Sequence, residues 1–197
     1  MDFAKHNITN VGQLMNFMQD KMKYGFTDGD KVYTEGPEFG QQMAQHYQLK
    51  TGEDLVKSGY GVCWDFCELE REFCEQKQIP HECYFFLPFL NHNEGGATHT
   101  FLLFEQNEKW HWFESAWQAY RGIWEYATKE EALNDIMNKL CQNNERPYEK
   151  IDLYKTAKAK AGSNFFEYIE HCLRGEKVDT KLLTNNQCRQ KESALTR

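Results

Sequence analysis

Apolar residues recur at helical spacing near the start of the chain, at Val11, Leu14, Met15, Met18 and Met22. Residues three and four apart share a helix face, so this pattern predicts a helix over residues 11–22, capped by Asn10. The same signals predict further helices over residues 37–48, 63–78 and 163–174. Two capping boxes predict two more: the one at 51–54 begins a short helix that ends at residue 58, and the one at 128–131 begins a longer helix. The polar, glycine-bearing stretch 24–36 predicts a loop or short hairpin.

Extended segments alternate with the later helices. Residues 81–89, 97–106 and 109–114 are rich in Phe, Tyr, Trp and Leu, which favour strands. Only Asn107 and Glu108 separate the last two, which indicates an antiparallel hairpin. The predicted order is helices, then the helix that begins at residue 63, then an antiparallel sheet. This order predicts an α+β fold in one domain over residues 1–184, followed by a frayed tail over 185–197. The basic run 155–160 is interpreted as a solvated helix face.

Composition narrows the class of protein. The chain has 197 residues, 40% hydrophobic and 15% aromatic, which suits one folded domain with a sizeable core. Its formal charge of -7 argues against a nucleic-acid partner. The longest apolar run, residues 84–90, is too short to cross a bilayer, and the first residues lack a secretion signal, so a cytoplasmic protein without a membrane partner is expected. Seven irregularly spaced cysteines favour free thiols in a reducing compartment, one of them reactive.

Cys63 is the candidate for that reactive thiol. It follows Gly61 and Val62 at the predicted start of a helix, where unpaired N–H groups and the helix dipole favour negative charge. Its backbone N–H is a natural oxyanion donor, and Gly61 is expected to let the backbone approach a substrate. A useful nucleophile needs a base, and the base needs an acceptor that orients it. His99 on one predicted strand and Glu114 at the end of the next supply both, at an expected side-chain separation of roughly 5 Å.

Less specific interpretations account for the remaining Cys, His and acidic residues. Cysteine is among the most buried residue types, so Cys67, Cys74, Cys83, Cys141 and Cys172 are assigned to the core. Asp65 is interpreted as a helix N-terminal acid. A structural zinc site would need close Cys-x-x-Cys pairs, and the sequence has none, so no metal and no cofactor are expected.

The segments that carry these residues resemble the transglutaminase-like superfamily. The resemblance rests on Gly61-Val62-Cys63-Trp64-Asp65-Phe66, Gln78-Ile79-Pro80, Thr98-His99-Thr100-Phe101 and Trp112-Phe113-Glu114-Ser115-Ala116-Trp117, and it covers roughly residues 55–117. It implies a papain-like core in which a nucleophile helix packs on an antiparallel sheet, with extra helices at both ends. The family usually has Asp-Pro where this chain has Glu114-Ser115.

The resemblance also implies a function. Cys63 would attack an amide or ester carbonyl of a protein or peptide substrate and form a thioester, while His99 moves protons. A second oxyanion donor is expected upstream, with Tyr24 as the first candidate and Tyr60 as the second, and Trp117 would form a wall of the site. The same triad serves hydrolysis and transamidation, so that choice stays open. The alternative hypothesis is a non-catalytic peptide-binding module, which the Glu-for-Asp departure and the surrounding tryptophans favour.

Overall fold

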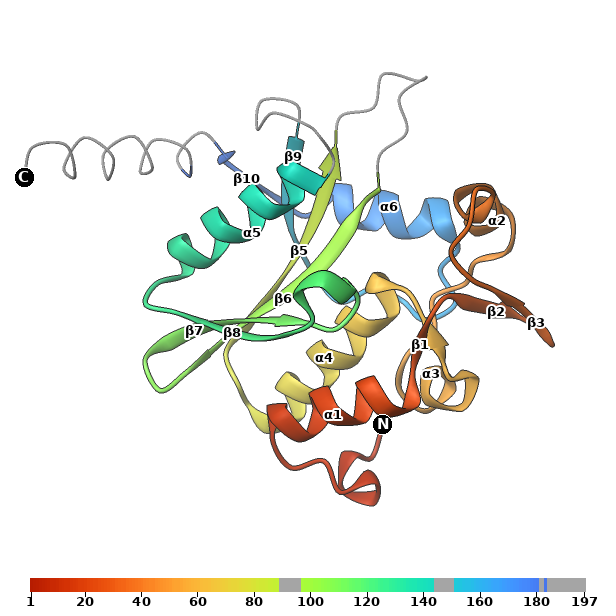
Figure 1. The fold of residues 1–197 in the computed structure, drawn as a ribbon, viewed down its shortest axis with the longest axis horizontal. Helices are drawn as coiled ribbons and strands as arrows, with labels where there is room; N and C mark the ends of the chain where they lie inside the picture. The colour runs from red at the N-terminus through yellow and green to blue at the C-terminus, as the bar shows by residue number, and fades with distance from the viewer. Residues whose placement is uncertain (89–96, 144–150, 181–182, 184–197) are drawn as a thin grey trace, which may run out of the picture.

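The computed structural model describes residues 1–88, 97–143, 151–180 and 183. At the centre of this part lies a six-stranded sheet, drawn in Figure 1, in which every neighbouring pair is antiparallel. Its order is β10 (Glu176–Val178), β9 (Ile151–Thr156), β5 (His81–Pro88), β6 (His99–Gln106), β7 (Lys109–Glu114) and β8 (Gly122–Tyr126). The structure therefore confirms a mixed α+β fold with an antiparallel sheet.

Helices surround this sheet. They are α1 (Val11–Lys21), α2 (Phe39–His46), α3 (Gly52–Ser58), α4 (Cys63–Lys77), α5 (Lys129–Asn143) and α6 (Phe165–Leu173), with 3-10 turns at Phe3–His6 and Gln118–Tyr120. Asn10 caps α1 as predicted, because its side chain accepts a hydrogen bond from the Gln13 N–H at 2.9 Å. The predicted hairpin within residues 24–36 is present as β2 (Phe26–Asp28) and β3 (Lys31–Tyr33). The predicted 185–197 tail and residues 91–96 lie outside the described residues.

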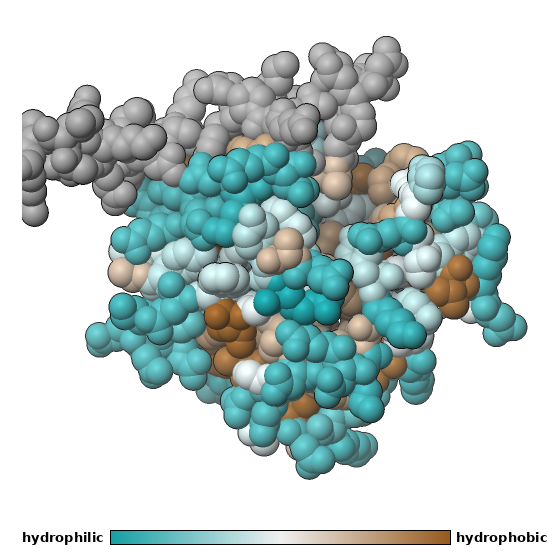
Figure 2. All heavy atoms as spheres, in the orientation of Figure 1, coloured by the Kyte–Doolittle hydropathy of each residue, from teal (hydrophilic) through white to brown (hydrophobic). Residues whose placement is uncertain are grey.

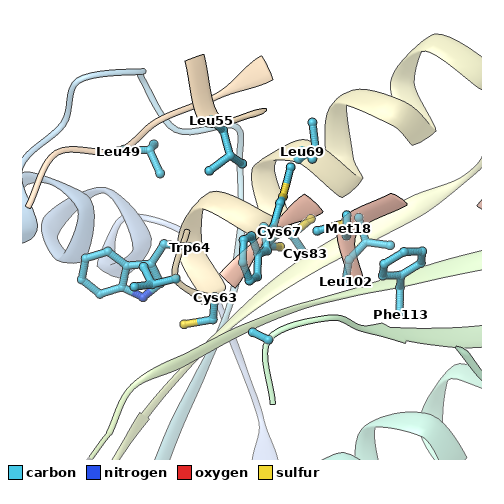
Figure 3. Close-up of a cluster of buried hydrophobic side chains, with 14 of the residues drawn as sticks. Met18, Leu49, Leu55, Cys63, Trp64, Cys67, Leu69, Cys83, Leu102 and Phe113 are labelled. Carbon is cyan, nitrogen blue, oxygen red and sulfur yellow. The ribbon is translucent and has the colours of Figure 1, made fainter. Parts of the chain in front are cut away.

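Two apolar layers cover the two faces of the sheet, and alternation along the strands decides which residue joins which layer. On β5, Phe85 packs in the layer that contains α1 and α4, whereas Phe86 packs in the layer that contains α5. On β6, Leu102 and Leu103 divide in the same way. In Figure 3, Cys63 and Trp64 lie at the start of α4, and Cys67 lies close to Cys83 of β5. The described cysteines are all free and buried.

Three strands of the six-stranded sheet were not expected from the sequence. β8 and β10 are the two edges of the sheet, and β9 pairs with β5 through the register Phe85↔Tyr154. The interpretation of residues 155–160 as a helix face is wrong, because Lys155 lies on β9. Its ammonium group bonds the Glu82 carboxylate on β5 at 2.7 Å. Long-range pairing, rather than local propensity, places this segment in the sheet.

Two local predictions also need correction. Thr51 precedes α3, but its side chain makes no capping hydrogen bond, and Gly52 has a φ of 51°, which moves the first turn away from capping geometry. Gly61 does not open the backbone towards a substrate. A Cβ at this position would lie 2.4 Å from the Phe66 ring and 2.9 Å from Leu55, so the glycine is required by packing inside the protein.

Figure 2 shows a largely hydrophilic face on which the apolar patches are small and separate. Within the described ranges, the structure contains no helix of the length and hydropathy needed to span a membrane.

Candidate active site

Cys63 is the first residue of α4, as the sequence predicted. It follows the two-residue strand β4 (Tyr60–Gly61), and Val62 is the extended N-cap residue between them. The first N–H groups of a helix have no partner within the helix, so the Cys63 N–H is free of the helical ladder. Cys63 is 4% exposed and therefore buried. This placement supplies a backbone donor and the positive end of the helix dipole beside the sulfur.

Asp65 fixes the turn that precedes Cys63. Its carboxylate accepts hydrogen bonds from the N–H of Val62 at 2.8 Å, the N–H of Lys50 at 2.8 Å and the hydroxyl of Tyr47 at 3.0 Å. Burial raises the pKa of Asp65 to about 6, and the three hydrogen bonds oppose that rise. The residue is thus a helix N-terminal acid, as expected, but it also connects residues 47–50 to the start of α4.

His99 and Glu114 form a buried pair. The Nε2 of His99 lies 2.7 Å from Oε2 of Glu114, and these side chains are 11% and 2% exposed. The other oxygen of Glu114, Oε1, accepts the N–H groups of Ala116 at 2.9 Å and Trp117 at 2.6 Å. A carboxylate held by two backbone donors is a fixed acceptor that sets the orientation of the imidazole.

The strand register shows why a glutamate suits this position. Leu102 pairs with Phe113, so the same register sets Glu114 opposite Phe101 and diagonal to His99. The expectation of directly opposed side chains at roughly 5 Å is therefore wrong, because diagonal neighbours on one face lie at about 7–8 Å. The longer side chain of glutamate spans this diagonal and reaches the imidazole.

Cys63 supplies the second partner of the His99 ring. Burial disfavours the charged imidazole, but the Glu114 carboxylate and a hydrogen bond to Cys63 outweigh it and raise the pKa of His99 to about 10. Since Glu114 occupies Nε2, Nδ1 is the ring atom left for the thiol. The structure thus brings Cys63, His99 and Glu114 together in the order that the sequence predicted.

Tyr24 joins this group, whereas Tyr60 does not. Tyr24 lies on β1 (Lys23–Tyr24), which pairs in parallel with β4 so that Tyr24 is opposite Gly61, two residues before Cys63. Burial, together with interactions with Cys63 and Glu35, raises the pKa of Tyr24 well above its usual value, so the phenol stays protonated and can donate. Tyr60 does not line the cavity described next. Tyr24 therefore both lines that cavity and interacts with the thiol.

A cavity of about 100 Å³ lies beside the triad. Its lining includes Tyr24, Glu35, His99, Trp117, Leu140 and Asn143. Trp117 meets His99 edge to face, with ring centroids 5.9 Å apart, as expected for a wall residue. Cys63 does not itself line this cavity; it lies behind Tyr24 and His99, which do. Trp112, in contrast, is fully buried in the layer on α5.

Sequence reasoning missed Glu70, a buried acid beneath the triad. Its carboxylate accepts a hydrogen bond from the Ser115 hydroxyl at 2.5 Å. Burial raises the pKa of Glu70 well above its usual value, the Ser115 bond opposes that rise, and the nearby Glu114 adds to it. A signal was present in the sequence, because Glu70 lies seven residues after Cys63 and so shares its helix face. Glu35 gave no such signal, because only the tertiary fold brings it to the cavity.

Within the residues that the structure describes, no group of three or more His, Cys, Asp or Glu side chains is arranged to hold a metal ion. Comparisons with protein-family models, curated proteins and solved structures give no match to this chain.

Proposed function

We propose that this protein is a thiol-dependent acyl-transfer enzyme with a papain-like, transglutaminase-like core, acting on protein or peptide amides. The single observation that carries the proposal is the placement of His99 between two partners: its Nε2 lies 2.7 Å from the Glu114 carboxylate, and its ring also interacts with Cys63. The helix that begins at Cys63 and the antiparallel strands that carry His99 and Glu114 match the arrangement that the sequence resemblance implies.

The proposed reaction begins with attack of the Cys63 sulfur on a carbonyl carbon. The thiol proton is held on His99, and the developing oxyanion is stabilised by the Cys63 N–H and the Tyr24 hydroxyl. His99 then gives its proton to the departing amine, the C–N bond breaks, and a thioester remains on Cys63. Water or a second amine attacks the thioester, His99 takes a proton from it, and the thiol is regenerated. Glu114 holds the imidazole in the tautomer that these steps require.

The test measures the alkylation rate of Cys63 by iodoacetamide at pH 6. An ordinary thiol of pKa 8.5 is about 0.3% ionised at this pH, so a thiolate paired with an imidazolium is expected to react about 10- to 100-fold faster, allowing for its lower intrinsic nucleophilicity. Cys67 and Cys172 are internal controls, because burial raises the pKa of both thiols, to about 12 for Cys172. Peptide mapping assigns the label to each site.

Substitution controls separate an enzyme from a binding module. The His99→Ala variant is expected to alkylate at the rate of an ordinary thiol, because it lacks the imidazolium. Incubation with p-nitrophenyl acetate is expected to acetylate Cys63 in the wild-type protein and to release p-nitrophenol repeatedly. A thiol that reacts no faster than a free cysteine and never carries an acetyl group would refute the proposal and favour the non-catalytic peptide-binding hypothesis.

A further inference from the structure

The cavity beside the triad has an uneven charge. Among the described residues that line it, Glu35 is the carboxylate, and neither lysine nor arginine is present. The other charged group is His99, whose positive charge is already compensated by Glu114. With a thiolate on Cys63, the described residues of the site and its cavity therefore carry a net negative charge.

Glu35 is close enough to the reacting atoms to matter. Its charge acts directly on the Tyr24 phenol, and that phenol also interacts with Cys63. A group held by Glu35 would thus share its cavity with Tyr24 and His99, the two side chains that interact with Cys63. Glu35 is exposed and, among the described residues, makes no ion pair of its own, so its carboxylate is available to a ligand.

The remaining lining suits a small cation on an alkyl chain. Trp117 offers an aromatic ring, which attracts cations, and Leu140 offers apolar surface for methylene groups. A volume of about 100 Å³ is roughly that of three water molecules in the liquid. This space accommodates an ammonium group with the end of its alkyl chain.

We propose that this cavity selects peptide substrates that carry a positively charged side chain next to the reacting carbonyl, with Glu35 as the specificity residue. The proposal rests on the proposed function, since it concerns the substrate of the same site. Glu35 is a substrate-binding residue here and takes no part in proton transfer.

The first experiment compares two iodoacetamides that differ only in charge, one with an N-(3-aminopropyl) group and one with an N-butyl group. The ratio of their rates at Cys63 is measured in the wild type, in Glu35→Gln and in Glu38→Gln. Glu38 is a matched control, because it is exposed on the same segment but does not line this cavity. An exposed ion pair between Glu35 and the charged probe would raise its alkylation rate about 2- to 5-fold over the neutral probe. Glu35→Gln is therefore expected to lower the ratio of the two rates by that factor, whereas Glu38→Gln leaves it unchanged.

Two controls make the result decisive. About 0.5 M NaCl is expected to bring the wild-type ratio down towards that of Glu35→Gln, because salt screens exposed charges. Equal ratios in the wild type and Glu35→Gln would overturn the inference. The N-butyl probe tests the proposed function separately: if it labels Cys63 rapidly in every variant, the proposed function survives whatever the charge ratio shows.

The second experiment locates the cation on the substrate. The p-nitrophenyl esters of N-acetyl-lysine and N-acetyl-norleucine place a charged or a neutral chain next to the same carbonyl. A kcat/KM about 2 to 5 times higher for the lysine ester, lost in Glu35→Gln, supports the inference. Equal kcat/KM values, combined with faster deacylation by 1,4-diaminobutane than by butylamine, would assign the cavity to the acyl acceptor and overturn it.

Discussion

Replacing Glu114 with glutamine tests the link between the acid and the thiol. Glutamine keeps the shape of the side chain and removes its charge. Oε1 of Glu114 faces two N–H donors, from Ala116 and Trp117, so the amide oxygen of glutamine must take that place. The amide NH₂ group then faces Nε2 of His99 and needs an acceptor there. Neutral imidazole can accept at Nε2 only when its proton is on Nδ1, the atom that faces the thiol.

The size of the effect follows from the charge of the pair. The pKa of His99 rises from 6.5 to about 10, with Glu114 the largest favourable contribution. At 1.36 kcal/mol per pKa unit, this rise corresponds to about 5 kcal/mol in favour of the imidazolium. Without the Glu114 charge, only the interactions with Cys63 oppose the effect of burial on the pKa of His99, and the proton on Nδ1 no longer comes from the thiol. We therefore expect acyl transfer to fall by about 10³- to 10⁴-fold, which is the scale on which a wrong tautomer acts in a triad.

The assay measures p-nitrophenyl acetate turnover and iodoacetamide alkylation at pH 6, in the wild type and in Glu114→Gln. Circular dichroism and thermal unfolding establish that both proteins are folded. Glu114→Asp is the matched control, because it keeps the charge but is too short to reach both the His99 ring and the turn at residues 116–117; an intermediate loss is expected. A Glu114→Gln protein that is folded, alkylates rapidly and turns over at the wild-type rate would refute the role of Glu114.

Three further outcomes are expected. Because the pKa of His99 is raised in the folded state, its contribution to stability is complete below about pH 6.5 and is lost as the pH rises through about 10. In urea titrations, the free energy of unfolding should therefore fall more between pH 7 and 10 in the wild type than in His99→Gln. Asp65→Asn should lower the free energy of unfolding by about 1–3 kcal/mol in urea titrations at pH 7, because one amide cannot accept all three of its hydrogen bonds. Glu108→Gly should raise the free energy of unfolding by about 1 kcal/mol in urea titrations. The reason is that Glu108 has a φ of 59° in the two-residue turn, a conformation that glycine adopts without strain.

Local signals in the sequence were enough to predict much of the fold. The cap at Asn10 and the apolar spacing after it predicted α1, and the start of α4 at Cys63 followed from its glycine-rich approach. The turn at Asn107 and Glu108 predicted the β6–β7 hairpin, and both residues have positive φ values, of 54° and 59°. This two-residue turn also fixes the diagonal relation of His99 to Glu114, which can therefore be derived from the sequence by counting back from the turn.

Other features depend on contacts between distant segments. β9 pairs with β5 across about seventy residues, and Lys155 on β9 gives no local sign of a strand. Tyr24 and Cys63 meet because β1 pairs in parallel with β4, a bridge of only two residues on each side. Glu35 reaches the cavity from a loop. Pairing of this kind is decided by tertiary packing, which single-segment propensity does not contain.

Glu114 and Ser115 stand where the family that the sequence resembles usually has Asp-Pro, and the structure gives each of them a distinct contact. The extra methylene of Glu114 spans the diagonal to His99, while its second oxygen holds the backbone of the following turn. Proline would stiffen this turn by fixing one backbone dihedral. Serine cannot do so, but its hydroxyl donates to the buried Glu70, which shares a face of α4 with Cys63. The helix α4 thus carries both Cys63 and Glu70, the residue that anchors the turn after Glu114. We infer that the Glu70–Ser115 hydrogen bond takes over the positioning role of proline, so that Glu114 does not by itself argue for a site without chemistry.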